Sequence, residues 1–138
     1  MSKYVLDASA LLALLNNEPG AQRVRDILAD SAISAVNLCE TAGKLTNAGM
    51  SLEDARTSIE LINLEVVPFD AESAYKAGAL IVEKKKLGLS LADRACLATG
   101  QMLGNVVVTA EHLWSILKIG VTVEVIRGNA PSLSEPGV

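Results

Sequence analysis

Aromatic side chains are scarce in this sequence of 138 residues, which contains one Phe, two Tyr and one Trp. A protein that grips nucleic acid by stacking bases on aromatic rings would be expected to carry more of them. The formal net charge of −4 also argues against a passive binder of nucleic acid, because such proteins normally present a basic surface. Contact with RNA would therefore depend on a local basic patch or on a bridging metal ion.

Cysteine and histidine are also rare, with two Cys and one His. Cys39 and Cys96 are far apart and have apolar neighbours, which predicts buried free thiols rather than a zinc site and suits a reducing compartment. His112 is expected to be a surface or helix-capping residue, not a catalyst. The chain has no apolar run of roughly 18 residues and does not begin like a secretory signal. These absences predict a cytoplasmic protein.

Short apolar runs alternate with helical patterns along the chain. The predicted strands are residues 4–6, 32–34, 65–69, 105–109 and 121–126, and the predicted helices are 8–15, 19–28, 36–48, 51–62, 70–85, 90–103 and 111–117. Strands separated by helices predict an α/β fold, with a central, mainly parallel sheet between two helical layers. We assign residues 1–127 to one such domain. Residues 128–138 are expected to form a flexible tail, because they are rich in Pro, Ser and Gly.

Two acidic residues follow predicted strands. Asp7 comes directly after the first strand, and Glu111 lies just past the strand that ends at Thr109. The carboxyl ends of parallel strands meet at one edge of the sheet, which is where such folds place their functional crevice. Asp7 is also flanked by apolar residues, and a buried charge without a partner is costly. A metal ion or an incoming basic group would supply that partner.

Ordinary structural roles can explain each acid taken singly. Two would cap helices, one would form an exposed ion pair, and one would be stabilised by a helix dipole. The roles are a cap at Asp7, a pair between Glu40 and Lys44, a capping box of Ser90 with Asp93, and a first-turn position for Glu111.

Four segments together carry a family resemblance. In chain order they are residues 5–15, 34–40, 88–98 and 108–114, and they contain Asp7, Glu40, Asp93 and Glu111. Each is a weak motif alone, but their order and intervals are specific. With these segments the chain resembles the PIN-domain nucleases, and within that group the VapC-type ribonuclease toxins of toxin–antitoxin pairs.

The resemblance implies a site of four acids with polar supports. Asp7, Glu40 and Asp93 match the acidic core, while Glu111 stands where the family more often has Asp. This departure leaves open whether Glu111 touches the metal directly or through water. The residues that would orient carboxylates or metal-bound water are Ser9, Ser90 and Thr109.

The activity implied is that of a Mg²⁺-dependent endoribonuclease, with Mn²⁺ as an alternative metal, whose products carry a 5′-phosphate and a 3′-hydroxyl. Carboxylate sites of this kind suit Mg²⁺ and phosphodiester hydrolysis. The implied partners are RNA, a second copy of the chain, and a cognate antitoxin whose basic C-terminal segment enters the acidic cleft. Lys44 and Arg94 are the candidate contacts to the RNA backbone, and residues 84–86 form a further basic cluster.

Three other functions are alternatives to this one. The chain could be a PIN nuclease of RNA processing without an antitoxin, or a PIN-fold interaction subunit that has lost catalysis. The short chain without an added RNA-binding module favours the toxin, and the presence of Asp7, Glu40 and Asp93 favours an active enzyme. A phosphoacceptor signalling domain is disfavoured, because it needs an acceptor Asp directly after a middle strand, and here Pro68-Phe69 intervenes before Asp70.

Overall fold

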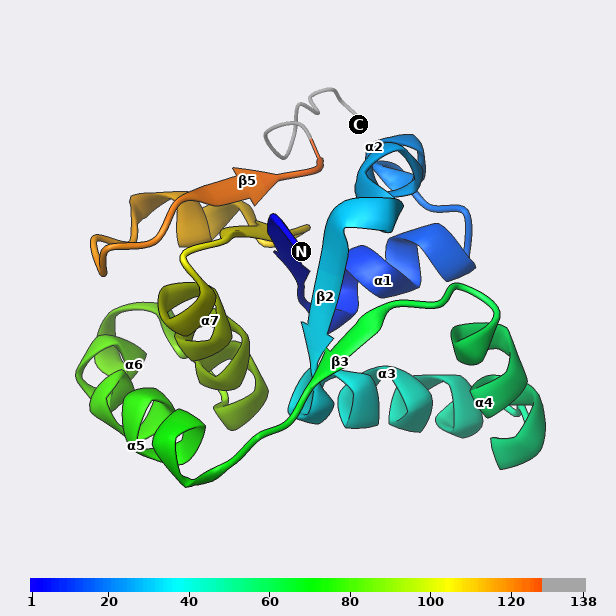
Figure 1. Ribbon diagram of the computed structural model, residues 1–138, viewed down its shortest axis with the longest axis horizontal. Helices are drawn as coiled ribbons and strands as arrows, with labels where there is room; N and C mark the ends of the chain where they lie inside the picture. The colour runs from blue at the N-terminus through cyan, green and yellow to red at the C-terminus, as the bar shows by residue number, and fades with distance from the viewer. Residues whose placement is uncertain (128–138) are drawn as a thin grey trace.

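The computed structural model describes residues 1–127, except for the side chains of residues 84–86, so the predicted flexible tail, 128–138, lies outside the described residues. A parallel sheet with strand order β3-β2-β1-β4-β5 occupies the centre (Figure 1). The strands are β1 (Tyr4–Leu6), β2 (Ser31–Ser34), β3 (Glu65–Val67), β4 (Val106–Thr109) and β5 (Val123–Val125).

Helices connect the strands throughout this region. The α-helices are α1 (Ala8–Leu15), α2 (Ala21–Ile27), α3 (Ala35–Asn47), α4 (Leu52–Glu60), α5 (Ala71–Ala79), α6 (Ile81–Leu87) and α7 (Leu91–Leu103), and the 3₁₀ turns are η1 (Leu28–Asp30) and η2 (His112–Ile116). None of the helices within residues 1–127 is long and apolar enough to cross a membrane.

The central strands are buried on both faces. Successive residues of a strand point to opposite sides of the sheet, so neighbouring residues enter different clusters of the core. Val5 and Val107 pack with α7 and Trp114 on one side. Leu6 and Val108 pack with α1 and α2 on the other. Figure 1 shows α5, α6 and α7 together on the first side and α1 and α2 on the second. The predicted three-layer α/β/α fold is confirmed.

Helix α3 starts at the carboxyl edge of the sheet, where Ser34 ends β2 and caps the helix through its side chain. It packs against α1, α4 and α7. Its buried stripe consists of Asn37, Thr41 and Leu45, four residues apart, which is the spacing of one helical face. Cys39 lies off this stripe and is exposed, so the prediction that both thiols are buried holds only for Cys96.

Two predicted elements differ in the structure. The helix expected over residues 70–85 is interrupted at Leu80, whose N–H donates to the carbonyl of Ala77. The tighter turn lets Leu80 pack into the core beside Ala77. The helix expected over 111–117 is the 3₁₀ turn η2, and Glu111 is the residue before it, so the predicted first-turn position was wrong by one residue.

Gly100 allows α7 to approach β4. A Cβ added to it would collide with the side chain of Val107 and lie 3.1 Å from Cγ2 of Val121. We expect Gly100→Ala to lower the free energy of unfolding by about 1–3 kcal/mol, because a tightly packed core resists an added methyl group. Denaturant unfolding measures the change.

Gly78→Ala is the matched control, since Gly78 is also helical but has nothing within 4 Å of its added Cβ. It should raise the free energy of unfolding by about 0.5–1 kcal/mol, because Ala is the better helix former. Equal unfolding free energies for the two variants would contradict the close packing of α7 on β4.

Candidate active site

Asp7 lies at the point where β1 becomes α1, and only 4% of it is exposed. Its Oδ1 accepts hydrogen bonds from the Ala10 N–H (2.8 Å) and the Ser9 hydroxyl (2.7 Å), which makes it the cap of α1. Its Oδ2 accepts from the Thr109 hydroxyl at 2.6 Å. The capping role and a place at the sheet edge therefore belong to the same carboxylate.

The two hydroxyls also organise the end of β4. The Ser9 oxygen accepts from the Ala110 N–H at 2.9 Å, and the Thr109 oxygen accepts from the Glu111 N–H at 3.0 Å. Because each hydroxyl donates to Asp7 and accepts from the backbone, the network ties β1, α1 and the segment carrying Glu111 into one unit.

Burial raises the pKa of Asp7 to about 6. The hydrogen bonds from Thr109, Ser9 and Ala10 act in the opposite direction, and the negative charge of Asp93 adds a smaller upward effect. Among the described side chains, which exclude those of residues 84–86, the ion pairs are Arg23–Glu124, Arg56–Glu60 and Arg127–Glu18, none of which involves Asp7. Asp7 is thus a buried carboxylate held by neutral donors only.

Asp93 lies in the first turn of α7, and Glu40 lies in the middle of the neighbouring helix α3. Asp93 closes a capping box at α7, where its carboxylate accepts from the Ser90 N–H (2.8 Å) and its own N–H donates to the Ser90 hydroxyl (3.1 Å). Glu40 is half-buried on α3. The ion pair considered between Glu40 and Lys44 is not among those formed by the described residues.

The four acids line one cleft of about 300 Å³, which we call the acidic cleft. It is also lined by the residues Ala8, Ser9, Lys44, Leu87, Gly88, Ser90, Leu113 and Trp114. Burial, reinforced by the charges of Asp7, Asp93 and Glu40, raises the pKa of the Cys96 thiol. These three charges therefore act on a common point in the core.

The carboxylates share the cleft without already forming a coordination cluster. Within the described part of the chain, no three Asp, Glu, His or Cys side chains are arranged to hold a metal ion. Asp7 and Asp93 turn oxygens toward their helix caps, while Glu111 is exposed. The donor set still suits a hard cation, because it consists of carboxylate and hydroxyl oxygens around a buried, unpaired charge.

The candidate RNA contacts fall in different places. Lys44 lines the acidic cleft. Arg94 does not, because its Nη1 donates to the carbonyl of Ala77 at 3.1 Å and its guanidinium lies against α5. His112 is exposed in η2. The side chains of residues 84–86 lie outside the described residues.

Sequence reasoning did not single out Asn37, which bridges the two helices that carry Glu40 and Asp93. Its Nδ2 donates to the carbonyl of Ala92 at 3.1 Å, and the side chain is buried. The available signal was a polar amide on the apolar stripe of α3, one turn before Glu40. Leu113 and Trp114 also line the cleft, and no local pattern marked them for that position.

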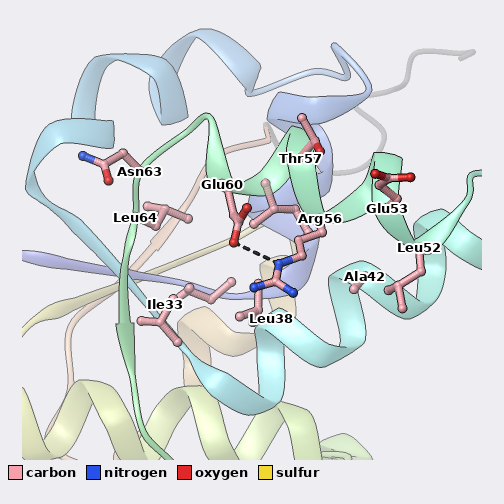
Figure 2. A pocket seen from close by; sticks show the side chains of 12 residues that line it. Ile33, Leu38, Ala42, Leu52, Glu53, Arg56, Thr57, Glu60, Asn63 and Leu64 are labelled. Atoms are coloured by element: carbon pink, nitrogen blue, oxygen red, sulfur yellow. Dashed lines mark hydrogen bonds and ion pairs between the residues drawn. The ribbon is translucent and has the colours of Figure 1, made fainter.

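A larger cavity of about 1160 Å³ lies between α3, α4 and the β2–β3 side of the sheet (Figure 2). Leu38, Leu52 and Leu64 are among the residues that form its walls. Figure 2 shows its charged pair, Arg56 and Glu60, joined to each other at 3.0 Å. It gathers no set of unpaired carboxylates, so the acidic cleft is the better candidate for chemistry despite its smaller volume.

The pKa of Asp7 predicts how the metal-free protein responds to pH. An unfolded Asp ionises near 3.8 and the folded one near 6, so the fold favours the protonated form. Stability should therefore fall as the pH rises through this interval, by on the order of 3 kcal/mol. In chelator, Asp7→Asn should remove most of this fall and melt higher than the parent at neutral pH.

Asp70→Asn is the matched control, since Asp70 also caps a helix, α5. Hydrogen bonds from the Ser73 N–H and hydroxyl lower the pKa of Asp70, so its contribution is present at neutral pH and lost on acidification. Asp70→Asn should lower the melting temperature at neutral pH. A parent whose stability in chelator stays constant across this pH interval would contradict the burial of an ionisable Asp7.

Comparison with known proteins places this geometry in a family. The PIN domain family matches residues 4–116. No curated relative matches the chain.

Solved structures share the fold at low identity. A chain of the DNA-bound VapBC complex from Salmonella typhimurium is 22% identical, with a TM-score of 0.71 over 91% of this chain and 99% of that one. A chain of promoter-bound VapBC2 from Rickettsia felis is 18% identical, with a TM-score of 0.70 over 88% and 97%. VapC20 from Mycobacterium tuberculosis, a toxin that cleaves the sarcin-ricin loop, is 18% identical, with a TM-score of 0.68 over 86% and 98%. With the family match over most of its length, this chain belongs to the PIN-domain family.

Proposed function

We propose that residues 1–127 form a Mg²⁺-dependent endoribonuclease domain that acts as the toxin of a toxin–antitoxin pair. The observation that carries the proposal is the acidic cleft itself, in which Asp7, Glu40, Asp93 and Glu111 line one cavity at the carboxyl edge of a PIN-domain sheet. Asp7 is buried there, and none of the described side chains forms an ion pair with it. A bound cation would remove the cost of that burial.

The four carboxylates would hold Mg²⁺, or Mn²⁺ in its place, with Glu111 reaching the ion directly or through water. Such an ion supplies Lewis-acid chemistry, activating water and stabilising charge on the oxygens of a phosphodiester. The chain's own part is positional. Ser9 and Thr109 hold both oxygens of Asp7, and Ser90 holds Asp93, so these acids keep their orientation in the cleft.

RNA is the proposed substrate, and a cognate antitoxin is the proposed partner. VapC20 is a toxin that cleaves the sarcin-ricin loop, and further neighbours are toxin–antitoxin complexes, including one from Klebsiella pneumoniae. An antitoxin with a basic C-terminal segment would complement the acidic cleft, because Arg or Lys side chains can occupy a pocket of carboxylates. We further propose that the chain acts as a homodimer.

Cleavage of RNA in the presence of Mg²⁺ tests the proposal directly. We expect Asp7→Asn and Asp93→Asn each to abolish cleavage, because Asn keeps the shape of Asp and removes the charge that attracts the ion. Asp54→Asn is the matched control for Asp93, since Asp54 occupies the same third position of a helix, α4, capped by Ser51. Asp54→Asn should cleave RNA at the parental rate. Parental cleavage by either site variant would remove that residue from the catalytic set.

Thermal melting tests the cation separately from the reaction. Millimolar Mg²⁺ or Mn²⁺ should raise the melting temperature of the parent near neutral pH, because a ligand that binds only the folded state stabilises it. Asp7→Asn should respond much less, since it offers fewer ligands. The melts are compared in chelator and in each metal. An equal metal response in parent and variant would show that the acidic cleft is not the binding site.

A further inference from the structure

A second hollow adjoins the acidic cleft. It has a volume of about 310 Å³, and its lining residues are Ser9, Leu12, Asn16, Glu18, Lys44, Leu45, Ala48 and Arg127. We call it the Arg127 basin. Ser9 and Lys44 line both the basin and the acidic cleft, so the two hollows meet at these residues. The acidic cleft and the Arg127 basin therefore form the two halves of one surface trough.

The two halves differ in charge. The acidic cleft contains four carboxylates and one cation, Lys44. The basin contains two cations, Lys44 and Arg127, and one carboxylate, Glu18. Lys44 is exposed and forms no ion pair with the described residues. The charge along the trough thus changes from negative to positive across Lys44.

Arg127 lines the basin but not the acidic cleft, and it contributes a guanidinium group to the trough. Its Nη2 donates to Oε1 of Glu18 at 2.7 Å, and its Nε donates to the carbonyl of Pro19 at 3.3 Å. The side chains of Arg127 and Glu18 are 38% and 41% exposed, so their ion pair is open to solvent and weak. A phosphate, which forms strong paired hydrogen bonds with a guanidinium, can compete with Glu18 for it.

We propose that the Arg127 basin binds the sugar–phosphate backbone of the RNA that flanks the bond cleaved in the acidic cleft. Lys44 contacts a phosphate where the two hollows meet, and Arg127 contacts the next part of the chain after exchanging Glu18 for phosphate. Leu12 and Leu45 give the sugars apolar walls, and the exposed amide of Asn16 offers a hydrogen-bonding group. This inference rests on the proposed ribonuclease activity and deepens it.

The physical need for the basin follows from the cleft. Carboxylates repel the phosphates on either side of the reacting one, and a cation at the centre of the cleft does not offset that repulsion farther along the strand. Two basic side chains beside the cleft supply the missing attraction locally. Single strands held by such contacts bind with an affinity that rises with length and falls with salt.

Binding of uridine oligomers tests the basin. Fluorescence anisotropy compares an RNA of about four nucleotides with one of about twelve, with Mg²⁺ present and in the Asp93→Asn background to prevent cleavage. We expect Arg127→Gln to weaken binding of the longer RNA about three- to tenfold and to reduce the salt slope by about 0.7, as for one lost phosphate contact. Lys44→Gln should act in the same direction, and both should lower the preference for the longer RNA.

Glu18→Gln makes the test sharp, because it breaks the same ion pair as Arg127→Gln but leaves the guanidinium free. It should strengthen binding of the longer RNA. If the pair merely stabilised the fold, the two variants would change binding in the same direction, and that result would overturn the proposal. Arg56→Gln breaks the exposed Arg56–Glu60 pair, which lines the separate cavity between α3 and α4, and should leave binding unchanged.

The outcomes also separate this inference from the proposed function. RNA binding by the Asp93→Asn protein that neither Arg127→Gln nor Glu18→Gln alters would overturn the basin alone, and leave a nuclease that uses another surface. Absence of RNA binding, together with absence of cleavage by the parent, would overturn both. Opposite shifts for Arg127→Gln and Glu18→Gln support the basin. Melting temperatures of all variants verify that each remains folded.

Discussion

A carboxylate withdrawn from water at the end of a central strand is the constraint around which this structure is organised. Asp7 forms no ion pair with the described side chains, and three neutral donors hold it, from Ala10, Ser9 and Thr109. These donors lower its pKa but do not outweigh burial, which keeps it near 6. The negative charge of Asp93 raises the pKa of Asp7 by less than burial does. Desolvation alone favours the binding of a cation by Asp7, without a contribution from repulsion by Asp93.

Structural roles and the proposed functional roles coincide in the acidic cleft. Asp7 caps α1, Asp93 lies in the first turn of α7, and both line the cavity. A helix N-terminus at the carboxyl edge of a parallel sheet provides backbone N–H groups that fix a carboxylate in place. The hydrogen bond from Asn37 to the Ala92 carbonyl joins α3 to α7, the helices that carry Glu40 and Asp93. Helix capping alone accounts for an acid at the position of Asp7. It does not account for the gathering of four acids around one cavity.

The distribution of charge is compatible with the proposed RNA substrate of an acidic protein. The net charge of −4 gives no general attraction for RNA. In the proposed complex, the two cations of the basin attract the phosphate chain locally, beside the carboxylates of the acidic half. The exposed pair of Arg127 with Glu18 keeps the basic half partly neutralised until a phosphate competes for the guanidinium. Binding under such control depends on the ion, the local cations and the length of the strand.

Local sequence determined much of this protein. Alternating strands and helices predicted the layered sheet, the apolar surroundings of Asp7 marked a buried charge, and the four motif segments indicated the family. Tertiary packing decided the rest. Leu80 interrupts a continuous helical pattern because its side chain is needed in the core. Lys44 and Arg94 were equal candidates beside acids, yet α5 takes the Arg94 guanidinium and Lys44 stays in the cleft. Arg127 and Ser9 line the same basin, although more than a hundred residues separate them in the sequence. No local sequence pattern predicts this proximity, because it depends on the order of the strands in the sheet.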